Sequence, residues 1–180
     1  NVWNTSSVTN MFRMFRNASS FNQPLNSWNT ASVTNMEAMF GDIPVFDQPL
    51  NNWDISQVTK TSYMFAGASV FDGNISNWDT SLVADMKGMF EGASSFNQPL
   101  DSWNTASVTN MEGMFLDAIS FKQTLSGDAW LSSKANKLKM FTGSSGSISS
   151  TVSGTFKRAK RVSYQTKMFK KCSKSSRGFY

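Results

Sequence analysis

Few residue types in this chain are suited to catalysis. The sequence has no histidine, so the usual general base at neutral pH and the commonest metal ligand are both missing. Carboxylates remain, because Asp47 and Asp72 share a column of polar residues spaced by 25 with Asn22 and Asn97. Hard cations bind carboxylate oxygens, but two carboxylates are too few for a convincing site. The column therefore predicts a solvated outward face, with a weak cation site as the alternative.

Motifs for other chemistry are also missing from the sequence. It contains no phosphate-binding glycine loop, no dinucleotide fingerprint, no Cys-x-x-Cys pair and no Gly-x-Ser-x-Gly element. The single cysteine, Cys172, excludes an internal disulfide. No apolar run approaches the ~20 residues that a membrane span needs. We therefore expect no enzyme activity and no cofactor.

Positive charge is concentrated towards the C-terminal end. Residues 1–129 carry 12 acidic and 5 basic residues, a net charge of −7, whereas residues 130–180 carry 12 basic residues and no acidic one. Such a pole attracts acidic glycans, anionic lipid, nucleic acid or an acidic protein face, and nucleic acid is disfavoured because no motif for it is present. The candidate contacts are Lys157, Arg158, Lys160, Arg161, Lys170 and Lys171. The alternative is a cap that only keeps this end soluble.

The elements that position these residues are set by an internal repeat. Five tryptophans and five Met-Phe pairs recur every 25 residues, and the segments 28–40 and 103–115 differ at one position. Repeats of about 20–50 residues are typical of solenoids and arrays. Trp130 with Met140-Phe141 marks a degenerate sixth copy, and Val162 with Met168-Phe169 marks a seventh.

This pattern predicts three parts. Residues 1–129 hold five regular repeats, residues 130–154 hold the degenerate sixth repeat with a Gly/Ser-rich segment, and residues 155–180 hold a basic seventh repeat or C-terminal cap. Terminal repeats are often atypical because they cap the stack. A plain basic tail over residues 155–180 is the alternative.

Each repeat is predicted to contain one helix. The second copy places apolar residues at i, i+3, i+6, i+7 and i+10, which is one face of a helix: Val33, Met36, Met39, Phe40 and Ile43. Asn29 precedes this run and is a favoured N-cap type. Gly41, Gly67 and Gly92 lie near the expected helix ends, where positive φ is often needed. We expect helices of about ten to twelve residues.

A short strand is predicted after each helix. Phe46, Gln48 and Leu50 alternate as in a strand, although Pro49 removes one hydrogen-bond donor. One helix and one strand per repeat is the content of a leucine-rich repeat. The expected fold is therefore α/β: a leucine-rich-repeat-like solenoid of about seven 25-residue helix-strand repeats with a parallel sheet, the last two repeats being degenerate. Each copy would be packed by the next.

The motif V-T-N-M-x-x-M-F-x-x-A-x-x-F-N-Q-P-L-x-x-W resembles the BspA-like leucine-rich-repeat surface proteins, in their branch described as a mycoplasma domain of unknown function. The resemblance is strong from Asn1 to about Phe121 and weak beyond it. It implies a solenoid on a cell-surface or secreted protein, with adhesion or partner binding and without enzyme activity. It transfers no functional residue to this chain.

Two functions follow from these observations. The favoured one is a non-enzymatic protein-interaction or adhesion module that binds a protein or an acidic glycan. The alternative is a structural subunit of an intracellular or membrane-associated assembly, docked through the basic end, which would also suit an anionic membrane surface. The opposite charges of the two ends further allow head-to-tail self-association.

Overall fold

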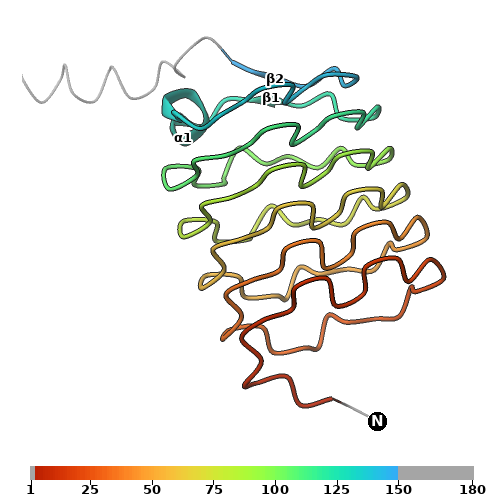
Figure 1. The fold of residues 1–180 in the computed structure, drawn as a ribbon. Helices are drawn as coiled ribbons and strands as arrows, with labels where there is room; N and C mark the ends of the chain where they lie inside the picture. The colour runs from red at the N-terminus through yellow and green to blue at the C-terminus, as the bar shows by residue number, and fades with distance from the viewer. Residues whose placement is uncertain (1–2, 150–180) are drawn as a thin grey trace, which may run out of the picture. The chain divides into compact units, whose positions relative to one another are not determined.

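The computed structural model describes residues 3–149 of the 180-residue chain. In this part the chain winds through successive coils that lie side by side, from the red N-terminal end to the blue C-terminal end (Figure 1). We define coil one as residues 3–25, coil two as 26–50, coil three as 51–75, coil four as 76–100, coil five as 101–125 and coil six as 126–149. The described elements are β1 (Thr124–Leu125), α1 (Asp128–Ser132) and β2 (Ser147–Ile148). Most of each coil is therefore turns and extended chain.

Neighbouring coils are joined by parallel backbone hydrogen bonds. Parallel bridges connect one residue of each coil to the next: Asn10, Asn35, Lys60, Asp85, Asn110 and Asn136. After each bridge, alternate backbone amides donate to carbonyls of the following coil. The Met36 amide donates to the Lys60 carbonyl at 3.0 Å, and the Phe40 amide donates to the Met64 carbonyl at 2.9 Å. The amides between them bond within their own coil, as Met39 donates to the carbonyl of Met36 at 3.2 Å. This segment is thus a series of tight turns that also forms a ladder along the stack.

Among residues 3–149, the helices of ten to twelve residues expected in each repeat are not formed. Residues 37–42 make turns, and Asn29 accepts a bond from the Ala31 amide at 3.1 Å, capping a turn instead of a helix. Equivalent Phe rings of neighbouring coils are 5.5–5.9 Å apart. Packed helices need about 8–10 Å between their axes, so coils at this spacing have no room for a helix each. The apolar residues have helical spacing because this series of turns points inward the same positions of the repeat that a helix would.

Left-handed backbone positions recur in two columns with one residue per coil. Within residues 3–149, every positive φ belongs to one of them. The first left-handed column, with φ of 52–59°, holds Arg13, Ala38, Tyr63, Gly88, Gly113 and Lys139. The second left-handed column, with φ of 55–75°, holds Asn17, Asp42, Gly67, Gly92, Asp117 and Gly143. Glycine, asparagine and aspartate tolerate this region best, which explains most of the second column.

Gly92→Val is expected to lower the free energy of unfolding by about 1–2 kcal/mol, the cost of a left-handed conformation for a residue with a Cβ. Space is not the cause, because a Cβ on Gly92 would meet its nearest atoms, in the Gly67 backbone, at 3.8 Å. Gly92→Asn is the matched control, since Asn17 occupies the same column, and it should lose much less. Urea unfolding of both variants measures this, and equal losses would contradict the conformational argument.

In the described part of the chain, the strands expected at the Phe-to-Leu segments form only between coils five and six. Residues 46–50 contain no strand, whereas β1 pairs in parallel with β2, with Thr124 opposite Ser147. Ser147 stands where three other coils have proline, and its amide donates to the Gln123 carbonyl at 3.1 Å. Proline has no amide hydrogen, so Pro24, Pro49 and Pro99 cannot make this bond. The parallel pairing in the regular coils lies instead at the bridges and turns.

The core consists of aromatic and methionine columns that run through the stack. Phe90 is fully buried, and its ring centroid lies 4.0 Å from Phe96, 5.7 Å from Phe65 and 5.5 Å from Phe115. The indole N–H groups of Trp53, Trp78, Trp103 and Trp130 donate to carbonyls of an earlier coil at 2.8–3.2 Å. The Met-Phe pairs of coils two to five are buried. Each coil is therefore packed mainly against its two neighbours.

The degenerate sixth copy continues the stack. Its Trp130 and Met140 are buried, and it is joined to coil five by the bridge from Asn110 to Asn136 and by β1 with β2. The predicted seventh repeat or cap, residues 155–180, lies outside the described residues. Among residues 3–149 no helix is long and apolar enough to cross a membrane.

Candidate binding groove

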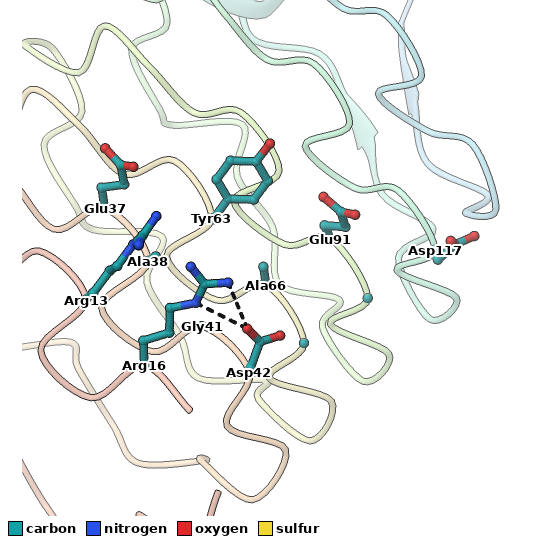
Figure 2. Close-up of a pocket in the computed structure, with 12 residues that line it drawn as sticks. Arg13, Arg16, Glu37, Ala38, Gly41, Asp42, Tyr63, Ala66, Glu91 and Asp117 are labelled. Carbon is teal, nitrogen blue, oxygen red and sulfur yellow. Dashed lines mark hydrogen bonds and ion pairs between the residues drawn. The ribbon is translucent and has the colours of Figure 1, made fainter. Parts of the chain in front are cut away.

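A groove of about 500 Å³ crosses the outer surface of the turns, from coil one to coil five (Figure 2). We call it the turn groove. Its lining residues are Arg13, Arg16, Glu37, Ala38, Gly41, Asp42, Tyr63, Ala66, Gly67, Glu91, Gly92 and Asp117. Most of them belong to the two left-handed columns or are direct neighbours of these columns in sequence. The ladder of turns thus both holds the coils together and forms the floor of the groove.

Small residues make the groove hollow. Gly41, Ala66, Gly67 and Gly92 lie along its floor, where larger side chains would fill the space. Tyr63 stands in the middle of the labelled side chains, between the arginines of coil one and the acids of coils four and five (Figure 2). The groove is therefore a shallow channel with one aromatic ring part-way along it.

The position of the Tyr63 ring depends on a glycine in the next coil. A Cβ on Gly88 would lie only 2.5 Å from Cε1 of Tyr63, so the ring occupies space that any other residue would take. Tyr63 is only half-buried, and its phenol also faces Lys87. The ring is thus held at the surface, where an aromatic side chain can contact a bound partner.

The basic residues that line the groove lie at its coil-one end, whereas its acidic residues extend from coil two to coil five. Arg13 and Arg16 lie at the coil-one end, while Glu91 and Asp117 lie towards the other end (Figure 2). Arg16 is partly engaged, because its guanidinium lies 3.3 Å from the carboxylate of Asp42. Both of these side chains are solvent-exposed, so their ion pair contributes at most about 1 kcal/mol and competes weakly with a ligand.

A second ion pair lies on the same turn surface. The ammonium of Lys87 is 3.2 Å from the carboxylate of Glu112. The hydrogen bond to Glu112 raises the pKa of Lys87, with a smaller contribution from Tyr63. Because the ordinary lysine pKa already lies far above neutrality, Lys87 stays charged in this position.

The predicted outward column lies on a different part of the coil and has a structural role. Asn22, Asp47 and Asp72 are exposed and Asn97 is half-buried. The side-chain oxygen of each accepts the backbone amide of the next coil at 2.9–3.3 Å: Asp47, Asp72, Asn97 and Lys122 are the donors. These bonds join the coils at the Phe-to-Leu segment, where coils one to five are not paired with one another through their backbones. Their role as links between coils was not foreseen by the sequence analysis.

Neither the outward column nor the rest of the described residues brings metal ligands together. Within residues 3–149, no group of three or more Asp, Glu, Cys or His side chains is arranged to hold a metal ion. One oxygen of Asp47 and one of Asp72 already accept amide bonds. The weak cation site considered as an alternative for this column therefore has no set of ligands in this part of the chain.

The six basic candidates of the C-terminal segment, from Lys157 to Lys171, lie outside the described residues. The described basic residues of coil six are Lys134, Lys137 and Lys139. Lys134 and Lys139 are exposed, whereas burial lowers the pKa of the half-buried Lys137. Coil six thus presents positive charge at the surface immediately before the basic segment.

Sequence reasoning missed the turn groove, although a signal for it was present. The two left-handed columns hold Gly88 and Gly92 in coil four, at a spacing of four residues, and Asn17 and Asp42 in coils one and two. Interior helix positions disfavour glycine by about 1 kcal/mol relative to alanine. The presence of both Gly88 and Gly92 in one repeat therefore favoured turns over a helix. Recognising left-handed positions would have placed the residues around them on an exposed turn surface.

No curated protein and no solved structure matches the chain. The sequence model of one family matches it twice, over residues 1–71 and 46–154. Together these matches span most of the chain, including all six coils. The chain therefore belongs to the family described as Mycoplasma protein of unknown function, DUF285.

Proposed function

We propose that this chain is a non-enzymatic interaction module, of the adhesion or protein-binding kind, and that the turn groove is its contact surface. The observation that carries the proposal is a contrast between columns. The inward Phe column is the same in coils one to six, whereas the first left-handed column changes from Arg13 through Ala38 and Tyr63 to Gly88. A stack with a purely structural role would not require its coils to differ at the surface.

The form and charge of the groove favour an extended peptide. Parallel strands are about 4.8 Å apart, so the four spacings from coil one to coil five measure about 19 Å, the length of about six extended residues. An acidic side chain of such a peptide would meet Arg13 and Arg16, and a basic one would meet Glu91 and Asp117. Tyr63 between them offers a ring, and aromatic residues often dominate binding energy at interfaces.

The wider setting of this module comes from resemblance. Its repeat motif is similar to that of BspA-like leucine-rich-repeat surface proteins, which favours a solenoid on a cell-surface or secreted protein. We assign it no catalytic role and no cofactor. The charge contrast between residues 1–129 and 130–180 supports a second candidate, a structural subunit docked on an acidic glycan, an anionic membrane or an acidic protein through the basic end.

The peptide proposal is tested with a synthetic array of hexapeptides that carry glutamate at one end and lysine at the other, in both orders, beside uncharged peptides. We expect mixed-charge peptides to bind more tightly than uncharged ones. Removing a groove charge by Glu91→Gln should weaken binding by up to about fivefold, the value of an exposed ion pair. Tyr63→Ala should weaken it by about tenfold or more, as for an aromatic hot spot. Isothermal titration calorimetry measures each affinity.

The matched control is Asp54→Asn. Asp54 is exposed and caps a turn by accepting the Ser56 amide at 2.9 Å, a bond that asparagine retains, as Asn29 and Asn104 do in other coils. It removes one negative charge away from the groove and should leave binding unchanged. Equal weakening by Asp54→Asn and Glu91→Gln would show that net charge, not the groove, attracts the peptides. Binding to heparin or anionic vesicles alone would favour the second candidate.

A further inference from the structure

The ring of Tyr63 and the carboxylate of Glu91 meet in the turn groove (Figure 2). Cε1 of Tyr63 and Oε2 of Glu91 lie 2.5 and 2.9 Å from one point, the position that a Cβ on Gly88 would take. The missing side chain of Gly88 therefore lets a ring of coil three approach a carboxylate of coil four. Both residues line the groove and both are half-buried, so each keeps a surface for a ligand.

The Tyr63 ring has a fixed position before any ligand binds. Its residue has a φ of 56°, which sets the direction of the side chain, and Gly88 leaves space for one edge of the ring. The phenol lies beside the ammonium of Lys87, which forms an ion pair with Glu112 at 3.2 Å. A ring held in this way loses little freedom on binding, which lowers the entropy cost of a complex.

The carboxylate of Glu91 is available to a ligand. Among residues 3–149, no side chain forms an ion pair or a hydrogen bond with it. The ion pair between Arg16 and Asp42 uses two of the six charged residues that line the groove. The other four are one basic and three acidic residues: Arg13, Glu37, Glu91 and Asp117. The unpaired charge of the groove is thus negative, and it attracts a cation towards the ring.

This combination of ring and carboxylate occurs once in the described stack. In the other coils, the position of Tyr63 is taken by Arg13, Ala38, Gly88, Gly113 and Lys139. The position of Glu91 is taken by Arg16, Gly41, Ala66, Leu116 and Thr142. The repeated core requires neither residue, because coils without them are built in the same way. The ring and the carboxylate therefore belong to the surface of the stack and not to its packing.

We propose that Tyr63 and Glu91 form an arginine subsite of the turn groove, an inference that rests on the proposed function and names the residue that the groove selects. The guanidinium of a bound peptide lies on the Tyr63 ring and donates two N–H bonds to the carboxylate of Glu91. Arginine fits this subsite better than lysine, because its planar guanidinium stacks on rings and matches a carboxylate with paired donors. The face of a tyrosine ring also attracts a cation.

The spacing of the coils fixes where the arginine stands in the peptide. Arg13 is in coil one and Glu91 in coil four, and three spacings of about 4.8 Å separate these coils by about 14 Å. Four residues of an extended peptide cover about 13 Å, and side chains four positions apart point to the same face. A peptide acid that meets Arg13 therefore places an arginine four positions away at the subsite. A separation of three positions points the two side chains to opposite faces.

The experiment measures the affinity of the full 180-residue chain for a set of hexapeptides by isothermal titration calorimetry. Each peptide carries one glutamate and, four positions away, arginine, lysine or citrulline, in both orders. A second set has a separation of three. Citrulline keeps the planar shape of arginine and removes its charge. At the separation of four only, we expect arginine to bind about three- to tenfold more tightly than lysine, and citrulline to bind most weakly.

Matched variants of the chain separate the subsite from the net charge of the groove. Glu91→Gln should lower the preference for arginine over citrulline by about threefold or more. Asp117→Asn removes the same charge one coil further along, in a column where Asn17 shows that asparagine is accepted, and should leave this preference nearly unchanged. Tyr63→Leu should remove the preference for arginine over lysine, whereas Tyr63→Phe, which keeps the ring, should retain it.

The outcomes distinguish this subsite from the groove as a whole. If mixed-charge peptides bind but arginine, lysine and citrulline are equivalent, or the separation has no effect, the groove binds peptides and the arginine subsite is wrong. If no mixed-charge peptide binds, the proposed function fails and the subsite fails with it. An equal loss of preference in Glu91→Gln and Asp117→Asn would assign the preference to net charge and overturn the proposal. The urea midpoint of each variant shows whether it is folded.

Discussion

Phe90→Ala is expected to lower the free energy of unfolding by about 3–5 kcal/mol, the range for removing a buried phenylalanine side chain. The side chain is fully buried and lies within about 6 Å of three other phenylalanine rings, in its own coil and in both neighbours. The cavity would be shared between three coils, and a stack held by rings at this spacing cannot close it without moving backbone. Urea unfolding followed by tryptophan fluorescence measures the loss.

Phe15→Ala is the matched comparison for this prediction. Phe15 has the same place in coil one, but its ring is only partly buried and is covered by a neighbouring coil on one side. In a repeat protein, stability is approximately a sum of repeat terms and nearest-neighbour terms, so the terminal site should lose less. Equal losses at both sites would mean that the coils are not stabilised by their neighbours in this way.

The inward residues of each repeat could be predicted from the sequence, but the backbone that carries them could not. Met36, Met39 and Phe40 are fully buried, as their spacing indicates. A helix and this series of turns place the same residues inward, so apolar spacing alone does not separate them. The difference lies in the partners of the amides. Phe40 donates to Met64 of the next coil, which is a contact 24 residues away that no local pattern reveals.

The candidate sites, like the backbone, depend on contacts between coils that local sequence patterns do not reveal. The outward placement of Asp47 and Asp72 follows from alternation along the chain, but their bonds to the next coil depend on how closely the coils approach. The turn groove requires the signs of φ at two positions per repeat. Gly67 and Gly92 gave part of that information, and Ala38 and Tyr63, which adopt positive φ without being glycine, gave none. Tertiary packing overrides the local preference at those two residues.

An in-register deletion is expected to be less harmful than a shorter one that breaks the register. Deleting residues 76–100 removes coil four whole and joins Ile75 to Asp101, which reproduces the junction between Leu100 and Asp101 in residue type. The inward columns, the amide ladder and the two left-handed columns then continue from coil three to coil five. Deleting only residues 76–87 removes half of that coil, including Trp78, Val83 and Met86, all of which are buried. The remaining half cannot cover either neighbour.

The measurement that tests this account most directly is the urea unfolding of these two deletion variants beside the full chain. The account predicts one cooperative transition for the 25-residue deletion, with a smaller m-value because less surface is exposed on unfolding. For the 12-residue deletion it predicts loss of the cooperative transition, although residues 88–100 of coil four are retained. A 12-residue deletion that unfolds as cooperatively as the 25-residue one, or at a higher urea concentration, would contradict the claim that each coil is packed by the next.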